Sequence, residues 1–115
     1  MFSALLWTHT VIAVLLALCA IIFSWNATGR RVVNAVASLQ FLVGLGIAGY
    51  MGANHMPLPP AIWWHLLIGL AIVTFFGVAM AAGKRAGRGG LVTAMSILGI
   101  VLTCFNLWLG SAMAR

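Results

Sequence analysis

Four long apolar segments, separated by short polar loops, constrain the fold of this chain more than any other feature. They cover residues 3–24, 32–53, 61–82 and 91–113, and each has about the length of an α-helix that crosses roughly 30 Å of hydrocarbon. Because the loops between them are short, sequential segments must be antiparallel neighbours. The sequence therefore predicts an all-α integral membrane protein, an up-down-up-down four-helix bundle that forms a single domain over residues 1–115.

The charge content agrees with a membrane location and excludes several functions. Only 5% of the residues are charged, whereas a soluble domain carries roughly 25%. The chain has no Asp or Glu at all. It therefore has no side-chain carboxylate to carry a coupled proton, to bind Na⁺ or to act as a general base, and a Ser-His-Asp triad is excluded.

The distribution of the basic residues predicts the orientation in the membrane. Lys and Arg occur in the first loop, in the third loop and at the C-terminus, and none occurs in the loop between the second and third segments. Because basic loops stay on the cytoplasmic side, loops 25–31 and 83–90 are expected inside and both termini outside. We expect a bacterial inner-membrane protein whose partners are the lipid bilayer and other membrane subunits, and no nucleic acid, despite the net charge of +6.

Two histidines are predicted to lie at the same depth near the outer face. Trp7 and Trp63–Trp64 mark the headgroup level on the first and third segments, as aromatic belts do. His9 follows Trp7 by two residues, and His65 follows the tryptophan pair directly. In a sequential four-helix bundle the first and third helices face each other diagonally across the core, so the two imidazoles could approach a flat macrocycle from opposite sides.

Small residues near this level would leave room for such a ring. Gly46 and Gly49 belong to the glycine-rich stretch GLGIAGYMG of the second segment, and Gly69 lies one turn after His65. Glycines of this kind also allow helices to pack closely without any cofactor. The prediction is therefore a cofactor site formed by His9 and His65 as metal ligands, with these three glycines beside them.

Other interpretations of the same residues stay open at the sequence level. The histidine pair could be structural, could hold a bare metal such as copper, or could relay protons. His55, in the second loop, could hydrogen-bond a haem propionate, replace one axial ligand or be solvated. Gln40, near the middle of the second segment, is a further candidate for contact with a ring substituent or a quinone.

The pattern of outer-side histidines on the first and third helices resembles that of small four-helix membrane b-type cytochromes. It is also similar to one half of a haem A synthase, in which a four-helix half carries such a pair. The synthases additionally use an acidic residue and paired outer-loop cysteines, and this sequence has neither. What the resemblance implies is therefore restricted to haem ligation, which it places on His9 and His65.

The sequence thus favours a membrane b-type cytochrome, or a haem-binding subunit of an electron-transfer complex, with haem b bound by two histidines near the outer face. The alternative is a non-catalytic accessory subunit of a respiratory or photosynthetic complex, with (bacterio)chlorophyll or no cofactor bound. Either assignment fits an electron-transfer or accessory subunit better than a stand-alone enzyme.

Overall fold

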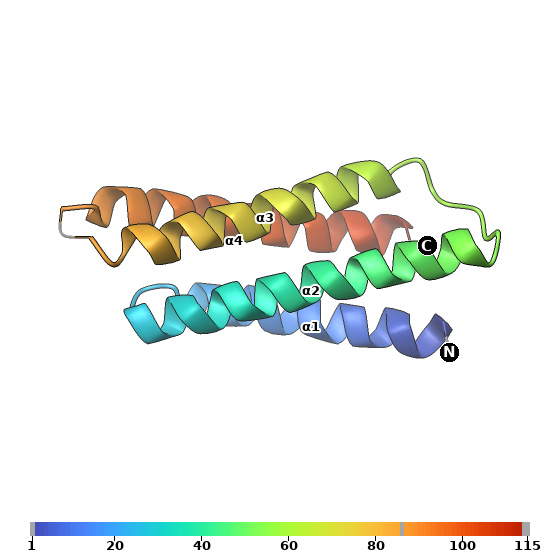
Figure 1. Cartoon of the computed structure of the whole chain (residues 1–115), viewed down its shortest axis with the longest axis horizontal. Coiled ribbons are helices and arrows are strands. Elements are labelled where there is room, and N and C mark those ends of the chain that lie inside the picture. The colour runs from blue at the N-terminus through green and yellow to red at the C-terminus, as the bar shows by residue number, and fades with distance from the viewer. Residues whose placement is uncertain (1, 86, 114–115) are drawn as a thin grey trace.

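The protein is a bundle of four long helices joined by three short connections (Figure 1). The structure is a computed structural model that describes residues 2–85 and 87–113. The helices are α1 (Phe2–Phe23), α2 (Ala27–Ala53), α3 (Ile62–Ala82) and α4 (Gly89–Met113). The predicted all-α four-helix fold is confirmed.

Each helix is long and apolar enough to cross a membrane, and the chain is accordingly an integral membrane protein whose outer surface contacts lipid. The bundle measures 50 × 22 × 22 Å, and its long axis follows the helices. Large apolar side chains are exposed along all four helices, which would be unfavourable in water but suits a hydrocarbon solvent.

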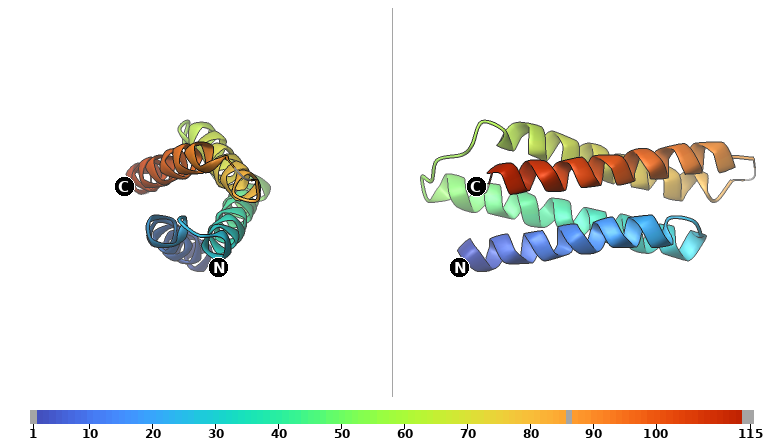
Figure 2. Two further views of the ribbon diagram at one scale, coloured as in Figure 1. Left: turned by 90° about the vertical axis from the view of Figure 1, so that its left-hand side faces the viewer. Right: turned by 180° about the vertical axis from the view of Figure 1, so that it is seen from behind.

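The helices pack in sequential order around the bundle (Figures 1 and 2). Each of α1 and α3 contacts both α2 and α4, and the described residues show no packing across either diagonal. The α3–α4 contact is the most extensive of the four, and the α1–α4 contact that closes the bundle is the least extensive. The expected up-down-up-down arrangement therefore places α1 and α3 on opposite sides of the bundle axis.

The second helix begins five residues earlier than the sequence pattern predicts. Asn26 caps it, because its side-chain oxygen accepts a hydrogen bond from the Gly29 amide at 2.7 Å. Arg30 and Arg31 consequently lie in the first turns of α2, so that the connection from α1 is much shorter than the loop of residues 25–31 that was expected. The prediction was wrong here because the helix begins before the apolar run does. Arginine favours helix, so Arg30 and Arg31 belong to the helix although their charge excludes them from the apolar run.

The close-packed core borders an open cavity, and Leu16, Ala37 and Ile72 belong to both. The core is a cluster of buried apolar side chains contributed by the first three helices, namely Leu16, Ala20, Val33, Ala37, Ile72 and Phe76. From this shared boundary the cavity extends toward the end of the bundle where α1 begins and α4 ends. Exposed tryptophans surround this end on three helices, Trp7, Trp63, Trp64 and Trp108, as expected for side chains at headgroup level.

Candidate functional site

The cavity has a volume of about 570 Å³ and receives side chains from all four helices. Its size falls within the roughly 300–1,000 Å³ that is usual for small-molecule and cofactor sites. The lining is mostly apolar, with seven polar or titratable side chains: His9, Thr10, Gln40, His65, Thr103, Asn106 and Ser111. An apolar cavity with a few converging polar groups is the usual form of a cofactor site.

The two histidines on the diagonal helices meet inside this cavity. The ring centroids of His9 and His65 are 5.9 Å apart, and the ring planes are nearly perpendicular at 82°. Because α1 and α3 do not pack against each other, these two side chains reach across the bundle where the helical backbones do not. The matched depth inferred from the tryptophans thus corresponds to a close approach in space.

A glycine on the neighbouring helix accommodates each imidazole. A Cβ atom placed on Gly44 of α2 would lie 3.3 Å from Cε1 of His9. A Cβ atom placed on Gly110 of α4 would lie 3.1 Å from Cε1 of His65. Both distances are shorter than ordinary van der Waals contact, so any larger residue at either position would push the ring aside.

A carboxamide side chain accompanies each histidine as well. Gln40 of α2 donates a hydrogen bond from Nε2 to the backbone carbonyl of His9 at 2.9 Å, which ties α2 to α1 at the level of the cavity. Asn106 of α4 lies beside the side chain of His65. Each carboxamide precedes its glycine by four residues, one helical turn, so that both face the same side of their helix.

Four polar atoms around the cavity are buried without a hydrogen-bond partner. They are Nδ1 of both histidines, Oε1 of Gln40 and Oδ1 of Asn106. Each such atom costs about 1–3 kcal/mol when it stays unpaired in an apolar interior. The two lining threonines differ, because Thr10 and Thr103 donate to backbone carbonyls of their own helices. These four atoms therefore retain unused capacity to coordinate a metal or to form a hydrogen bond.

The other residues singled out in the sequence lie in different places. Gly69 lines the cavity and lies against Phe41. A Cβ atom placed on Gly69 would be 3.3 Å from Cδ1 of Phe41. Gly46 and Gly49 do not line the cavity, and a Cβ on either would meet open space. His55 is exposed in the connection between α2 and α3, with a positive φ of 53°, and it also lies outside the cavity lining.

The sequence places Gly44 among the glycines at this level without distinguishing it from Gly46 and Gly49, and it does not assign Asn106 or Gly110 to the site. The signal that could have found them is a repeated pattern in the two hairpins. Gln40 and Gly44 in α2 have the same spacing as Asn106 and Gly110 in α4. The spacing from histidine to glycine is longer in the second hairpin, and a direct alignment of the hairpins therefore obscures the repeat.

The number of histidine ligands in the cavity is two. Across the described residues, no group of three or more His, Cys, Asp or Glu could hold a metal. A bare transition-metal ion in a protein usually takes three or four protein ligands, whereas a porphyrin supplies four nitrogens and leaves two axial positions for the protein. Two histidines and no third ligand match the second arrangement.

Fold and site together define an integral membrane four-helix bundle with a paired-histidine cavity in one half of the bundle. Comparison with protein-family models, with curated proteins and with solved structures finds no match to this chain.

Proposed function

We propose that this protein binds a haem b through His9 and His65 and works as a membrane cytochrome or as the haem-carrying subunit of an electron-transfer complex. The observation that carries the proposal is the pair of imidazoles 5.9 Å apart, inside an apolar cavity that also contains four unpaired polar atoms. Two metal–imidazole bonds of about 2 Å in line, together with the size of the rings, would separate the centroids by roughly 6 Å.

The residues of the site have separate roles under this proposal. His9 and His65 would hold the metal, and the glycines at 44 and 110 would leave their rings the space to do so. Gln40 fixes the backbone of α1 at His9 through its hydrogen bond. A haem held in this way supplies reversible one-electron chemistry. Because both histidines would ligate the iron, the site would favour electron transfer over oxygen binding.

Imidazole ligands favour iron over magnesium, since magnesium prefers oxygen ligands. This preference places haem ahead of a (bacterio)chlorophyll in the same cavity. The three connections between the helices are short and offer little surface on which a soluble electron carrier could dock. We infer that its redox partner is another membrane subunit that packs against the exposed apolar surface of the bundle.

The reduced-minus-oxidised absorption spectrum of the purified protein tests the proposal directly. We expect the sharp α and β bands of low-spin haem b, with about one haem per chain after expression with adequate haem supply. A spectrum without haem bands from such a preparation would contradict the proposal. A chlorophyll-type spectrum, or co-purification with a large complex and no pigment, would support the accessory-subunit alternative instead.

The orientation is a further part of the proposal and has its own prediction. The positive-inside rule places the α2–α3 connection outside and the α3–α4 connection in the cytoplasm. In a chain whose free cysteines, Cys19 and Cys104, are replaced by serine, a cysteine at position 55 should react with an impermeant maleimide in intact cells. A cysteine at position 88 should react only after the cells are opened. The reverse labelling pattern would invert the orientation and place the histidine pair near the cytoplasm.

A further inference from the structure

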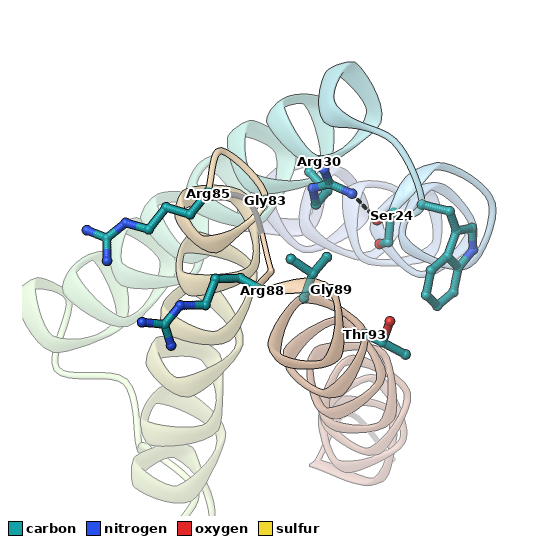
Figure 3. Close-up of a pocket in the computed structure, with 9 residues that line it drawn as sticks. Ser24, Arg30, Gly83, Arg85, Arg88, Gly89 and Thr93 are labelled. Carbon is teal, nitrogen blue, oxygen red and sulfur yellow. Dashed lines mark hydrogen bonds between the residues drawn. The ribbon is translucent and has the colours of Figure 1, made fainter.

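A second pocket lies at the opposite end of the bundle from the histidine pair (Figure 3). It has a volume of about 300 Å³ and is formed where α1 turns into α2, where α3 ends and where α4 begins. The polar and charged side chains that line it are Ser24, Arg30, Arg85, Arg88 and Thr93. Trp25, Val92 and two glycines complete the lining. Its lining therefore differs from that of the apolar cavity around His9 and His65.

Arg30 is held in a fixed position within this pocket. Its guanidinium group lies against Gly83, so that a Cβ atom at that position would come within 2.6 Å of Nη2 and 2.7 Å of Nε. Nη1 donates to the carbonyl of Ser24 at 3.4 Å (Figure 3). Nε is buried and has no acceptor. The arginine is thus positioned by its neighbours, while part of its hydrogen-bonding capacity is unused.

Two further sets of donors face the same space. Ser24, 1% exposed, lines the pocket, and its Oγ has no hydrogen-bond partner. The 25-residue helix α4 begins at Gly89, another lining residue, and the first N–H groups of a helix have no acceptor within it. A helix N-terminus with free amides and a favourable dipole is suited to an anion.

The chain contains no group that could neutralise this end. It has no Asp or Glu anywhere in its sequence. Arg85 and Arg88 are exposed on the rim of the pocket and extend their guanidinium groups away from Arg30 (Figure 3), which adds positive charge to the same end of the bundle. An anion that balances these charges must therefore come from outside the chain.

We propose that this pocket is a phosphate-binding site, with Arg30 and Ser24 as its central ligands and the N-terminus of α4 as its third wall. The donors come from α2, from the connection that precedes it and from the N-terminus of α4, an arrangement suited to a tetrahedral group with several oxygens. The guanidinium fork matches phosphate geometry, and charge-assisted hydrogen bonds of this kind are about twice as strong as neutral ones. The phosphate belongs either to the headgroup of an anionic lipid or to a free phosphate compound. The site does not depend on the haem proposal.

The sharpest test compares two adjacent arginines. Arg30→Gln and Arg31→Gln remove the same charge from neighbouring positions, but Arg31 is exposed and does not line the pocket. In maltoside micelles, which contain no phosphorus, phosphatidylglycerol is added in one series and inorganic phosphate in the other. Binding is followed by native mass spectrometry and by the rise in melting temperature.

We expect Arg30→Gln to weaken phosphate binding about tenfold, the loss typical of a charge-assisted hydrogen bond, and Arg31→Gln to weaken it less than twofold. Binding of phosphatidylglycerol alone identifies a lipid site, and binding of inorganic phosphate alone identifies a site for a free phosphate compound. Equal losses in the two variants, or no binding in either series, would overturn the proposal.

A second variant keeps the test decisive if Arg30→Gln does not fold. Ser24→Ala removes one small hydroxyl whose oxygen has no protein partner, and therefore sacrifices no internal hydrogen bond. We expect it to elute and melt as the unaltered protein does without phosphate, and to bind phosphate roughly threefold to tenfold more weakly. Unchanged phosphate affinity in Ser24→Ala would remove the serine from the site and would contradict the proposal as stated.

Discussion

Replacing His65 by alanine is expected to reduce the haem content of the purified protein at least tenfold and to abolish the low-spin spectrum. His65 projects from α3, which packs against both α2 and α4. Its ring lies close to Gly110, where an added Cβ atom would be 3.1 Å from Cε1 of His65. Sites held on packed helices keep their geometry better than sites on loops, so we expect no loop side chain to replace His65 as a metal ligand. The measurement is the haem-to-protein ratio with the reduced-minus-oxidised spectrum.

His9→Ala and His55→Ala complete this experiment. His9 lies in the same cavity, on the terminal helix α1, so His9→Ala should lose haem or retain a five-coordinate, high-spin form bound by the other histidine. His55 is exposed in a connection and lies outside the cavity lining, so His55→Ala should keep the low-spin spectrum with at most a modest shift in potential. The opposite result, with haem lost in His55→Ala and a normal spectrum in His9→Ala, would identify His55 and His65 as the ligands.

The sequence allowed the histidine pair to be predicted because depth in a membrane helix can be inferred from fixed markers. Tryptophans set the headgroup level on α1 and α3, and the bundle topology made these two helices diagonal. Both inferences depend on distances along a helix axis, which follow from a rise of 1.5 Å per residue. The resulting close approach of His9 and His65 appears in the structure at 5.9 Å between ring centroids.

Which face of a helix points inward was harder to predict. In water an apolar stripe marks the buried face, but a membrane helix is apolar on all sides because lipid is as apolar as the core. Gly46 and Gly49 therefore looked equivalent to Gly44 in the sequence, although only Gly44 lies against His9 and lines the cavity. Assigning a rotation to α2 required its packing against α1, which the sequence pattern does not contain.

At the opposite end of the bundle, Arg30 is both a basic residue near a helix end and part of the lining of the second pocket. The basic residues there were interpreted as topology signals, a property that depends only on charge and position. The pocket around Arg30 depends instead on a glycine at position 83, on the exact start of α2 at its Asn26 cap and on the buried Ser24 hydroxyl. These features come from two segments far apart in the sequence, the α1–α2 connection and the end of α3, and only the folded chain brings them together.

Gly29→Ala is expected to be the most destabilising single methyl addition in this bundle, with a loss of about 3 kcal/mol or more in the free energy of unfolding. Gly29 is buried in the first turn of α2, where a Cβ atom would overlap the backbone carbonyl oxygen of Phe23, the last residue of α1. A backbone atom cannot rotate away as a side chain can. The added methyl group must therefore separate the two helix ends or break the hydrogen bond between the Gly29 amide and Asn26.

Gly49→Ala is the matched control, since it adds the same methyl group to the same helix. Position 49 is exposed, and a Cβ atom there meets no neighbour within 4 Å. Alanine favours helix over glycine by about 1 kcal/mol, so this variant should be as stable as the unaltered protein or slightly more stable. Denaturant titration followed by circular dichroism in maltoside micelles measures both changes. Equal stability of the two variants would show that the α1–α2 junction is looser than the contact between Gly29 and Phe23 implies.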